Sequence, residues 1–463
     1  MDWKTFLSAA KGLFPDDLFL IDAEDCLRYG SDWTKTAGTA GLVVRPRTTD
    51  EVSEVLKLCS QMKIPVVPSG GRTGLAGGAV ARGELVLSFE RMNRLSEVDI
   101  HGNTVRVQAG ATTQAVHEHC APQGLMWPID LASKGSCEIG GNLSTNAGGL
   151  RVIRYGMARK WVVGLQAVTM AGEILELNRD LEKNNTGYDL IQLLIGSEGT
   201  LAVITEATLK LTRFPNHSWV MFFPFESPRA TLDFFAEARR GPFEILAFEF
   251  FSKACLDIVS ARLNRQSRLG HSSPFYALME VEFPVGREDE VDQWLGMMLE
   301  NRVVSDGLLA KSESEKDQVW GLREGITESI QATAPVKKYD VSVPVRKLAA
   351  FLEEVERALK QSGLGIELYL FGHLGDGSPH LNLVKPAIST MEQFNQDCAE
   401  FEKTIFVLLK SYGGSVSAEH GVGILKKHWL TVSRSPAEMR LFRDIKRVFD
   451  PQGLLNPGKV IDL

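Results

Sequence analysis

Short apolar runs separated by glycine loops dominate the first 215 residues or so. Between two of these runs, Val52, Val55 and Cys59 recur at three- and four-residue steps, which predicts a helix. A second helix is expected at 114–123. Strands are predicted at the runs 43–44, 65–68, 85–89, 104–107, 164–170 and 201–211. This order predicts a mixed α+β region without the regular strand–helix alternation of a doubly wound sheet.

The pattern changes near residue 216, beyond which strands interleave with amphipathic helices. Strands are predicted at 246–251, 275–283, 339–343 and 366–371, and helices at 288–301, 316–333 and 345–361. This order predicts an open antiparallel sheet with helices on one face. We therefore expect an α+β fold with domains at 1–215 and 216–425, and a C-terminal helical segment at 426–463 that packs back on the first domain.

Composition and charge narrow the class of protein. The chain has 51 lysines and arginines against 58 aspartates and glutamates, a net charge of −7, which argues against a nucleic-acid partner. Its six cysteines form no CxxC motif, which is typical of reduced thiols in a cytoplasmic protein. No apolar run approaches the ~18 residues of a membrane span. We expect a cytoplasmic protein.

Three glycine loops are the first candidates for chemistry. Five glycines fall within residues 70–78, directly after a predicted strand, and similar clusters follow at 130–149 and 196–200. Such loops let backbone N–H groups converge on a phosphate. Taken alone, the first loop fits neither the G-x-G-x-x-G nor the phosphate-loop spacing, and it is equally explained as a flexible surface loop. Three loops in one region fit a long ligand with several polar groups, such as FAD.

The second half contains a set of metal-ligand types. His373 and His380 flank a tight Gly-Asp-Gly turn that can bring both rings to one side of a corner, and Glu419 and His420 follow later in the chain. Two imidazoles and a carboxylate are a usual set for a catalytic zinc, and manganese or cobalt would also fit. A histidine pair at this spacing is by itself more often structural.

A group of side chains suits a substrate carboxylate. Arg323 and Thr327 are four residues apart and therefore share a helix face, and Lys338 opens the next strand. Arginine binds a carboxylate through two parallel hydrogen bonds. Asn382 lies two residues beyond His380, on the same face of a strand. Each of these residues alone would be read as an ordinary polar or surface side chain.

Together these segments resemble the vanillyl-alcohol oxidase / PCMH flavoprotein superfamily, with a PCMH-type FAD-binding domain at 1–215. The later motifs are similar to FAD-linked D-2-hydroxyacid dehydrogenases, most closely to the bacterial ones that act on D-2-hydroxyglutarate. The resemblance implies non-covalent FAD, because residues 68–80 contain no histidine to which it would be attached. The FAD-binding residues that it implies are Pro68, Ser69, Gly70, Gly71, Arg72, Thr73, Gly74, Gly77, Gly78, Asp130, Ser133, Gly135, Ser136, Gly140, Gly141, Asn142, Asn146, Gly148, Gly149, Glu198, Gly199, Ile204 and Asn456.

The same resemblance assigns roles in the domain at 216–425. It implies a divalent metal, zinc first, and a catalytic histidine that also contacts the substrate. One departure is that relatives often carry an asparagine after the Gly-Asp-Gly turn, where this chain has Ser378 and Pro379. The implied metal ligands are His373, His380 and Glu419, the implied base is His420, and the implied substrate contacts are Arg323, Thr327, Lys338, Asn382 and His420.

These parts suit the oxidation of a D-2-hydroxy acid to its 2-oxo acid by hydride transfer to flavin N5. D-2-hydroxyglutarate is the favoured substrate, with D-malate and D-lactate next. The resemblance also implies an electron acceptor such as an electron-transferring flavoprotein or a quinone-linked chain. Three other hypotheses stay open: the flavin subunit of a glycolate oxidase complex, a metallohydrolase, and a non-catalytic flavin-binding protein. The oligomeric state, a homodimer among others, is not encoded in any motif.

Overall fold

The computed structural model describes residues 1–264 and 272–463, which form two compact units. Unit 1 comprises Met1–Gly149, Met157–Phe214 and Glu419–Leu463, and unit 2 comprises Leu150–Gly156 and Pro215–Ala418. The chain thus returns to unit 1 at Glu419, before the expected position 426, because the following turn bonds within unit 1. There the Gly423 N–H donates to Glu198 (2.8 Å) and the Ile424 N–H donates to the Ala76 carbonyl (3.0 Å).

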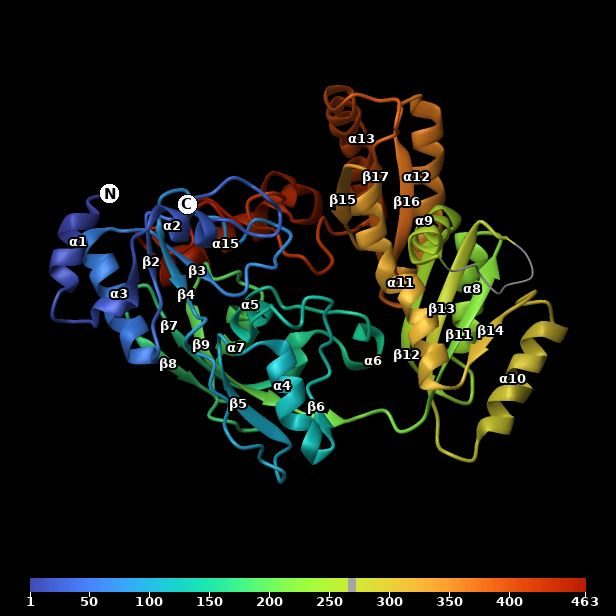
Figure 1. Ribbon diagram of the computed structural model, residues 1–463, viewed down its shortest axis with the longest axis horizontal. Helices are drawn as coiled ribbons and strands as arrows, with labels where there is room; N and C mark the ends of the chain where they lie inside the picture. Colours follow the sequence, from blue (N-terminus) through green and yellow to red (C-terminus); the bar gives the residue numbers. More distant parts are fainter. Residues whose placement is uncertain (265–271) are drawn as a thin grey trace. The chain divides into compact units, whose positions relative to one another are not determined.

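The first sheet of unit 1 carries the parallel strands that precede the first glycine loop. Its order is β1-β2-β4-β3, and β2, β4 and β3 are parallel. The helix α3 (Thr49–Met62) joins β2 to β3 and buries Val52, Val55 and Cys59 in the core, as its spacing predicts. Figure 1 shows α3 beside these strands. The strands are β1 (Phe19–Leu20), β2 (Leu42–Val44), β3 (Val66–Ser69) and β4 (Leu85–Ser88).

The second sheet of unit 1 is antiparallel, in the order β5-β9-β7-β8. The helices α4 (Thr113–Cys120) and α5 (Ile139–Ser144) add Val116, Ile139 and Leu143 to its apolar core. The strands are β5 (Thr104–Gln108), β7 (Val162–Val168), β8 (Ile174–Leu177) and β9 (Val203–Lys210).

The C-terminal helix α15 (Pro436–Phe449) is attached to unit 1 by a buried lysine. Lys446 is 4% exposed, and its Nζ donates to the carbonyls of Thr200 and Leu455, both at 2.7 Å, and to Asp450 at 2.6 Å. Each donor of the ammonium therefore has an acceptor, as a buried charge requires.

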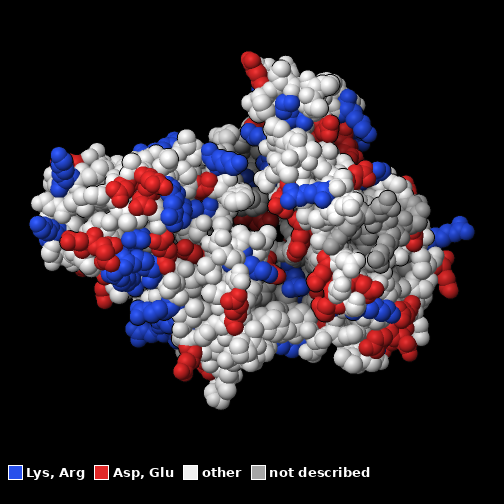
Figure 2. Space-filling view, in the orientation of Figure 1, with Lys and Arg blue, Asp and Glu red and all other residues white. Residues whose placement is uncertain are grey.

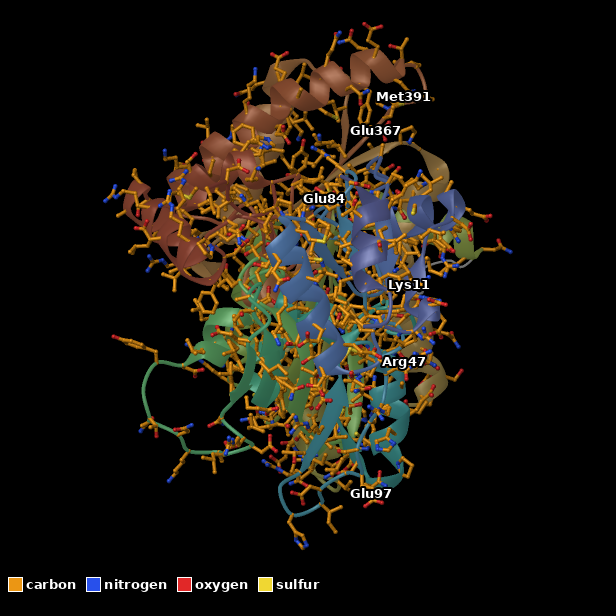
Figure 3. The ribbon with its side chains drawn as sticks, turned by 90° about the vertical axis from the view of Figure 1, so that its left-hand side faces the viewer. Lys11, Arg47, Glu84, Glu97, Glu367 and Met391 are labelled. Carbon is orange, nitrogen blue, oxygen red and sulfur yellow. The ribbon has the colours of Figure 1, made fainter. Side chains whose placement is uncertain are left out.

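Unit 2 is built on a seven-stranded antiparallel sheet in the order β14-β11-β13-β12-β16-β17-β15. The strand β16 begins at Glu367, which Figure 3 labels, and ends at His373. The strands are β11 (Ser218–Phe225), β12 (Glu244–Ser252), β13 (Phe275–Glu282), β14 (Leu308–Ala310), β15 (Val336–Asp340), β16 (Glu367–His373) and β17 (Ser378–Val384).

Helices cover both faces of this sheet, which corrects the expectation of one covered face. On one face, Val319 and Ile326 of α11 pack with Phe222 and Phe251. On the other face, Phe234 of α8 lies 4.9 Å from Phe223, centroid to centroid. Consecutive residues of β11 are apolar and buried, so both faces need a cover. The helices are α8 (Pro228–Ala238), α9 (Lys253–Leu263), α10 (Glu288–Glu300), α11 (Glu313–Thr333), α12 (Leu348–Ser362) and α13 (Met391–Tyr412).

Side chains of both charges are intermixed over the described residues of the face in Figure 2. Within 1–264 and 272–463, no helix combines the length and the apolar character that a membrane crossing requires. All six cysteines are buried free thiols, as the sequence predicts.

Candidate active site

A pocket in unit 1 brings the three glycine loops together. It is formed where β3 and α5 meet the turn at 196–200, and His420 also lines it. The predicted FAD-binding residues that line this pocket are Pro68, Ser69, Gly70, Gly71, Arg72, Thr73, Gly74, Gly78, Gly140, Gly141, Asn142, Glu198, Gly199 and Ile204.

Close packing of backbone on backbone explains two of the glycines. A Cβ atom at Gly71 would lie 1.8 Å from the Ser136 carbonyl oxygen, so the first loop approaches the second only with glycine there. Gly149 has φ +107°, and a Cβ there would lie 2.1 Å from the Asp130 carbonyl oxygen. The loops are therefore held rigidly against one another.

Several predicted residues shape the pocket without lining it. Asn456 donates to the carbonyls of Gly78 (3.2 Å) and Glu198 (2.8 Å), which joins two lining segments. Asn146 accepts a hydrogen bond from the backbone N–H of Arg159 (3.0 Å). The predicted residues outside the lining are Gly77, Asp130, Ser133, Gly135, Ser136, Asn146, Gly148, Gly149 and Asn456.

Glu198 positions the turn that carries His420. Its two carboxylate oxygens accept from the backbone N–H groups of Val422 (2.7 Å) and Gly423 (2.8 Å). Burial raises the pKa of Glu198, and these two backbone hydrogen bonds oppose that rise. The sequence-based expectation placed Glu198 among the FAD contacts; it lines the pocket, but both of its oxygens are already engaged.

Glu138 is a pocket residue that sequence reasoning missed. It is 8% exposed, lines the pocket, and its Oε2 has no hydrogen-bond partner among the described residues. Burial raises the pKa of Glu138 to about 8, against the opposing charge of Arg72. A carboxyl that is neutral near pH 7 can donate a hydrogen bond. The feature of the sequence that could have identified Glu138 is its position two residues before the Gly140-Gly141 pair of α5.

The residues of this pocket fit FAD. Glycine backbones form the cradle, and one buried oxygen of the lining, Glu138 Oε2, lacks a partner among the described residues. Backbone N–H groups in glycine loops suit a pyrophosphate, and unpartnered buried polar atoms are rare unless a ligand or water satisfies them.

In unit 2, the turn between β16 and β17 brings the two histidines together. The ring centroids of His373 and His380 are 5.3 Å apart. In the β16–β17 register, His373 faces Ser378 and Phe371 faces His380, so these side chains share one face of the sheet. The Gly-Asp-Gly turn thus produces the corner that its sequence predicts.

Each histidine has a carboxylate beside its Nδ1. His373 Nδ1 lies 2.7 Å from Glu249 Oε1, and His380 Nδ1 lies 3.8 Å from Asp340 Oδ1. Histidines that bind metals commonly hold a carboxylate at the other ring nitrogen, so both rings fit a metal bound at Nε2. Sequence reasoning missed Glu249 and Asp340. The sequence signal was an acid next to aromatic residues: Glu249 lies between Phe248 and Phe250 in β12, and Asp340 follows Tyr339 at the end of β15.

Arg323 is buried beside this pair and is already bound to protein. Its Nε and Nη2 lie 2.8 Å and 2.7 Å from Glu249 Oε2, and its guanidinium carbon is 4.9 Å from the centroid of the Phe371 ring. The bidentate hydrogen bond to a substrate carboxylate that the sequence predicts therefore cannot use Nε and Nη2, which already bind Glu249. Nη1 is the guanidinium nitrogen that can bind a ligand. Burial alone would raise the pKa of Glu249, but His373 and Arg323 hold it below its ordinary value.

The other predicted substrate contacts of unit 2 belong to the same region. Lys338 of β15 pairs in register with Asn382 of β17, as Asp340 does with His380, so these four side chains share one face. Burial lowers the pKa of Lys338. Asn382 is 2% exposed. Thr327 is half-buried on α11, one turn after Arg323.

Glu419 and His420 are described within unit 1. Glu419 Oε2 accepts from the backbone N–H of Gly149 (3.3 Å), and its Oε1 lies 3.8 Å from His420 Nε2. His420 also lines the pocket of unit 1.

Family comparisons define the class of protein. Residues 40–178 match the FAD binding domain family, and residues 214–460 match the family described as FAD linked oxidases, C-terminal domain. The second match alone spans more than half of the 463 residues. The chain belongs to the FAD-linked oxidases and is a flavin-dependent oxidoreductase.

Particular relatives are similar along nearly the whole chain. A D-2-hydroxyglutarate dehydrogenase of Xanthomonas citri pv. viticola is 43% identical over 95% of this chain and 93% of its own length. One of Stutzerimonas stutzeri is 42% identical over 95% of each chain. A putative mitochondrial D-lactate dehydrogenase of Schizosaccharomyces pombe is 37% identical over 95% of this chain and 85% of its own.

Solved structures confirm the predicted fold class. The chain is similar to p-cresol methylhydroxylase, with a TM-score of 0.74 and 17% identity over 99% of this chain and 97% of that one. It is also similar to 4-ethylphenol oxidase from Gulosibacter chungangensis, with a TM-score of 0.76 and 15% identity over the same shares. The fold is the PCMH-type flavoprotein fold.

Proposed function

We propose that this chain is a metal-dependent D-2-hydroxyglutarate dehydrogenase that uses non-covalent FAD. One observation carries the proposal: two imidazoles, with carboxylates at their Nδ1 atoms, share a sheet face with a lysine and adjoin a buried arginine. Relatives at 42–43% identity that bear this enzyme's name support the choice of substrate.

We propose that Glu419 completes a zinc site begun by His373 and His380. The reach of the chain supports this assignment. In unit 2, Ser417 Oγ donates to Asp340 Oδ2 (3.2 Å), and Asp340 adjoins His380. Glu419 is two residues after Ser417, so its Cα lies within ~7 Å of the Ser417 Cα. Two imidazoles and one carboxylate leave a coordination position for substrate, as in catalytic zinc sites.

The oxidation removes a proton from the 2-hydroxyl and a hydride from C2. When bound, FAD supplies the hydride acceptor and the metal ion lowers the pKa of the hydroxyl. The Nη1 end of Arg323 and the Lys338 ammonium bind the substrate carboxylates, which fixes the face of C2 that is presented. His420, on the turn held by Glu198, accepts the hydroxyl proton at its imidazole. The two electrons then pass to a separate acceptor, which we expect to be an electron-transferring flavoprotein or a quinone-linked chain.

D-Lactate is a second candidate substrate, since the Schizosaccharomyces pombe relative is named for it. The two substrates differ in a distal carboxylate. Lys338 gives the site a second cation besides Arg323, which can bind the distal carboxylate of D-2-hydroxyglutarate. D-Lactate has no second carboxylate for Lys338 to bind.

Anaerobic mixing of the purified, FAD-loaded chain with D- and L-2-hydroxyglutarate, D-malate, D-lactate and glycolate tests the proposal. We expect the visible flavin band to bleach fastest with D-2-hydroxyglutarate, and the L-isomer to leave it unchanged. Fastest bleaching by D-lactate would replace the substrate assignment. A flavin that no hydroxy acid reduces would overturn the proposal.

A further inference from the structure

We propose that Glu249 is a positioning residue that orients the metal ligand His373 and the substrate-binding Arg323 together; this inference rests on the proposed function. Glu249 lies in the middle of the β12 strand and is fully buried. One oxygen, Oε1, contacts His373 Nδ1 at 2.7 Å, and the other, Oε2, contacts Arg323 Nη2 at 2.7 Å. One side chain therefore contacts both halves of the candidate site in unit 2.

The surroundings argue against a merely structural ion pair. Arg323 occupies a position in the apolar stripe of α11 between Val319 and Ile326, where a hydrophobic side chain would pack on Phe371. Replacing a buried ion pair by apolar residues is often neutral or stabilising. A charged group at this point is therefore not needed for the stability of the core, and it requires another use.

The geometry gives that use at the histidine. An ionised carboxylate only accepts hydrogen bonds, so the proton of His373 lies on Nδ1, and Nε2 carries the lone pair with which the ring would bind a metal. The same hydrogen bond fixes the rotation of the ring. His380 has a weaker counterpart, since its Nδ1 is 3.8 Å from Asp340 Oδ1, beyond a direct hydrogen bond. Glu249 therefore gives His373 a direct hydrogen bond that orients its ring.

The geometry gives a second use at the arginine. Both Nε and Nη2 point at Glu249 Oε2, and the guanidinium carbon lies 4.9 Å from the Phe371 ring centroid. These contacts fix the guanidinium plane and leave Glu249 bonded to Nε and Nη2 rather than to Nη1. Because the two tasks share one carboxylate, a change at Glu249 is expected to disturb metal affinity and substrate affinity together.

Glu249→Gln tests this role, with Glu280→Gln as the matched control. Glu280 is also a buried glutamate of this sheet, paired to Arg151 (3.1 Å). The glutamine at 249 retains the shape but can accept from only one of its two partners. We expect Zn²⁺ affinity of the FAD-loaded chain, measured by competition with a chromophoric chelator, to fall about 10–100-fold, the usual cost of losing such a partner. We also expect KM for D-2-hydroxyglutarate to rise, with FAD content unchanged.

The outcomes separate this role from the proposed function. Wild-type Zn²⁺ affinity in Glu249→Gln, or an equal loss in Glu280→Gln, would overturn the role of Glu249 alone. A wild-type chain that binds no Zn²⁺ would overturn the metal-dependent function as well. Should Glu249→Gln fail to fold, the double variant Glu249→Leu/Arg323→Met replaces the ion pair by apolar side chains. It should show the same loss of Zn²⁺ affinity, and unchanged affinity would overturn the role.

Discussion

Replacing Glu138 by glutamine removes a buried ionisable group of the FAD pocket, whose Oε2 has no hydrogen-bond partner among the described residues. Burial raises the pKa of Glu138 to about 8 from an ordinary value of 4.5. Near pH 7 the carboxyl is therefore protonated and can donate to the cofactor, whereas at pH 9 it is an anion that repels the FAD pyrophosphate. FAD binding should then weaken as the pH rises through about 8.

The size of the effect follows from the proton equilibrium. With a pKa of about 8, the protonated fraction falls from about nine-tenths at pH 7 to about one-tenth at pH 9. If FAD binds the protonated form, its Kd rises about tenfold, which is about 1.4 kcal/mol. Titration of the apoprotein with FAD, followed by flavin fluorescence between pH 6.5 and 9, measures this rise. Glu138→Gln should remove most of it.

The same pKa fixes the sign of a stability effect. Between pH 4.5 and about 8, folded apoprotein holds the Glu138 proton and the unfolded chain does not, so the free energy of unfolding falls as pH rises through this window. Glu138→Gln should reduce that fall, by up to about 5 kcal/mol over the full window. An identical pH dependence of FAD affinity in wild type and Glu138→Gln would refute the reasoning.

Two further substitutions test the packing of unit 1. Gly71→Ala places a Cβ 1.8 Å from the Ser136 carbonyl oxygen, so we expect the two loops to separate and the purified protein to lose most of its FAD, as measured by its flavin absorbance per chain. Lys446→Met leaves the buried Asp450 carboxylate without its counter-charge, with only the backbone N–H groups of Leu454 and Leu455 as partners. This should lower the free energy of unfolding by about 3–5 kcal/mol in a denaturant titration; a change below about 1 kcal/mol would contradict this.

The local parts of the fold could be predicted from the sequence. The three- and four-residue steps of Val52, Val55 and Cys59 predict the helix α3, which covers Thr49–Met62. The Gly-Asp-Gly turn is enough to place His373 and His380 side by side, because the corner is built within one hairpin. The strand expected at 339–343 instead covers Val336–Asp340, since its residues pair with β17 from Val384 to His380.

The long-range parts could not be predicted in the same way. Glu249 is 124 residues before His373 and contacts it only because β12 and β16 become neighbours in the sheet. No local pattern announces that pairing. The sequence is enough to mark Arg323 as a candidate for binding a substrate carboxylate. Its ion pair with Glu249, in contrast, depends on how α11 packs on the sheet. The second helical layer could have been predicted from the sequence. Successive residues of β11 are apolar, so both faces of this strand must be covered.

The metal requirement of hydride transfer tests the central claim most directly. The measurement is the single-turnover rate of flavin reduction by D-2-hydroxyglutarate in anaerobic stopped flow, before chelation, after chelation, and after Zn²⁺ is restored. The proposed site of His373, His380 and Glu419 predicts loss of reduction on chelation, recovery with Zn²⁺, and no recovery in His380→Ala, with FAD bound throughout. Metal-free protein that reduces its flavin at the undiminished rate would contradict it.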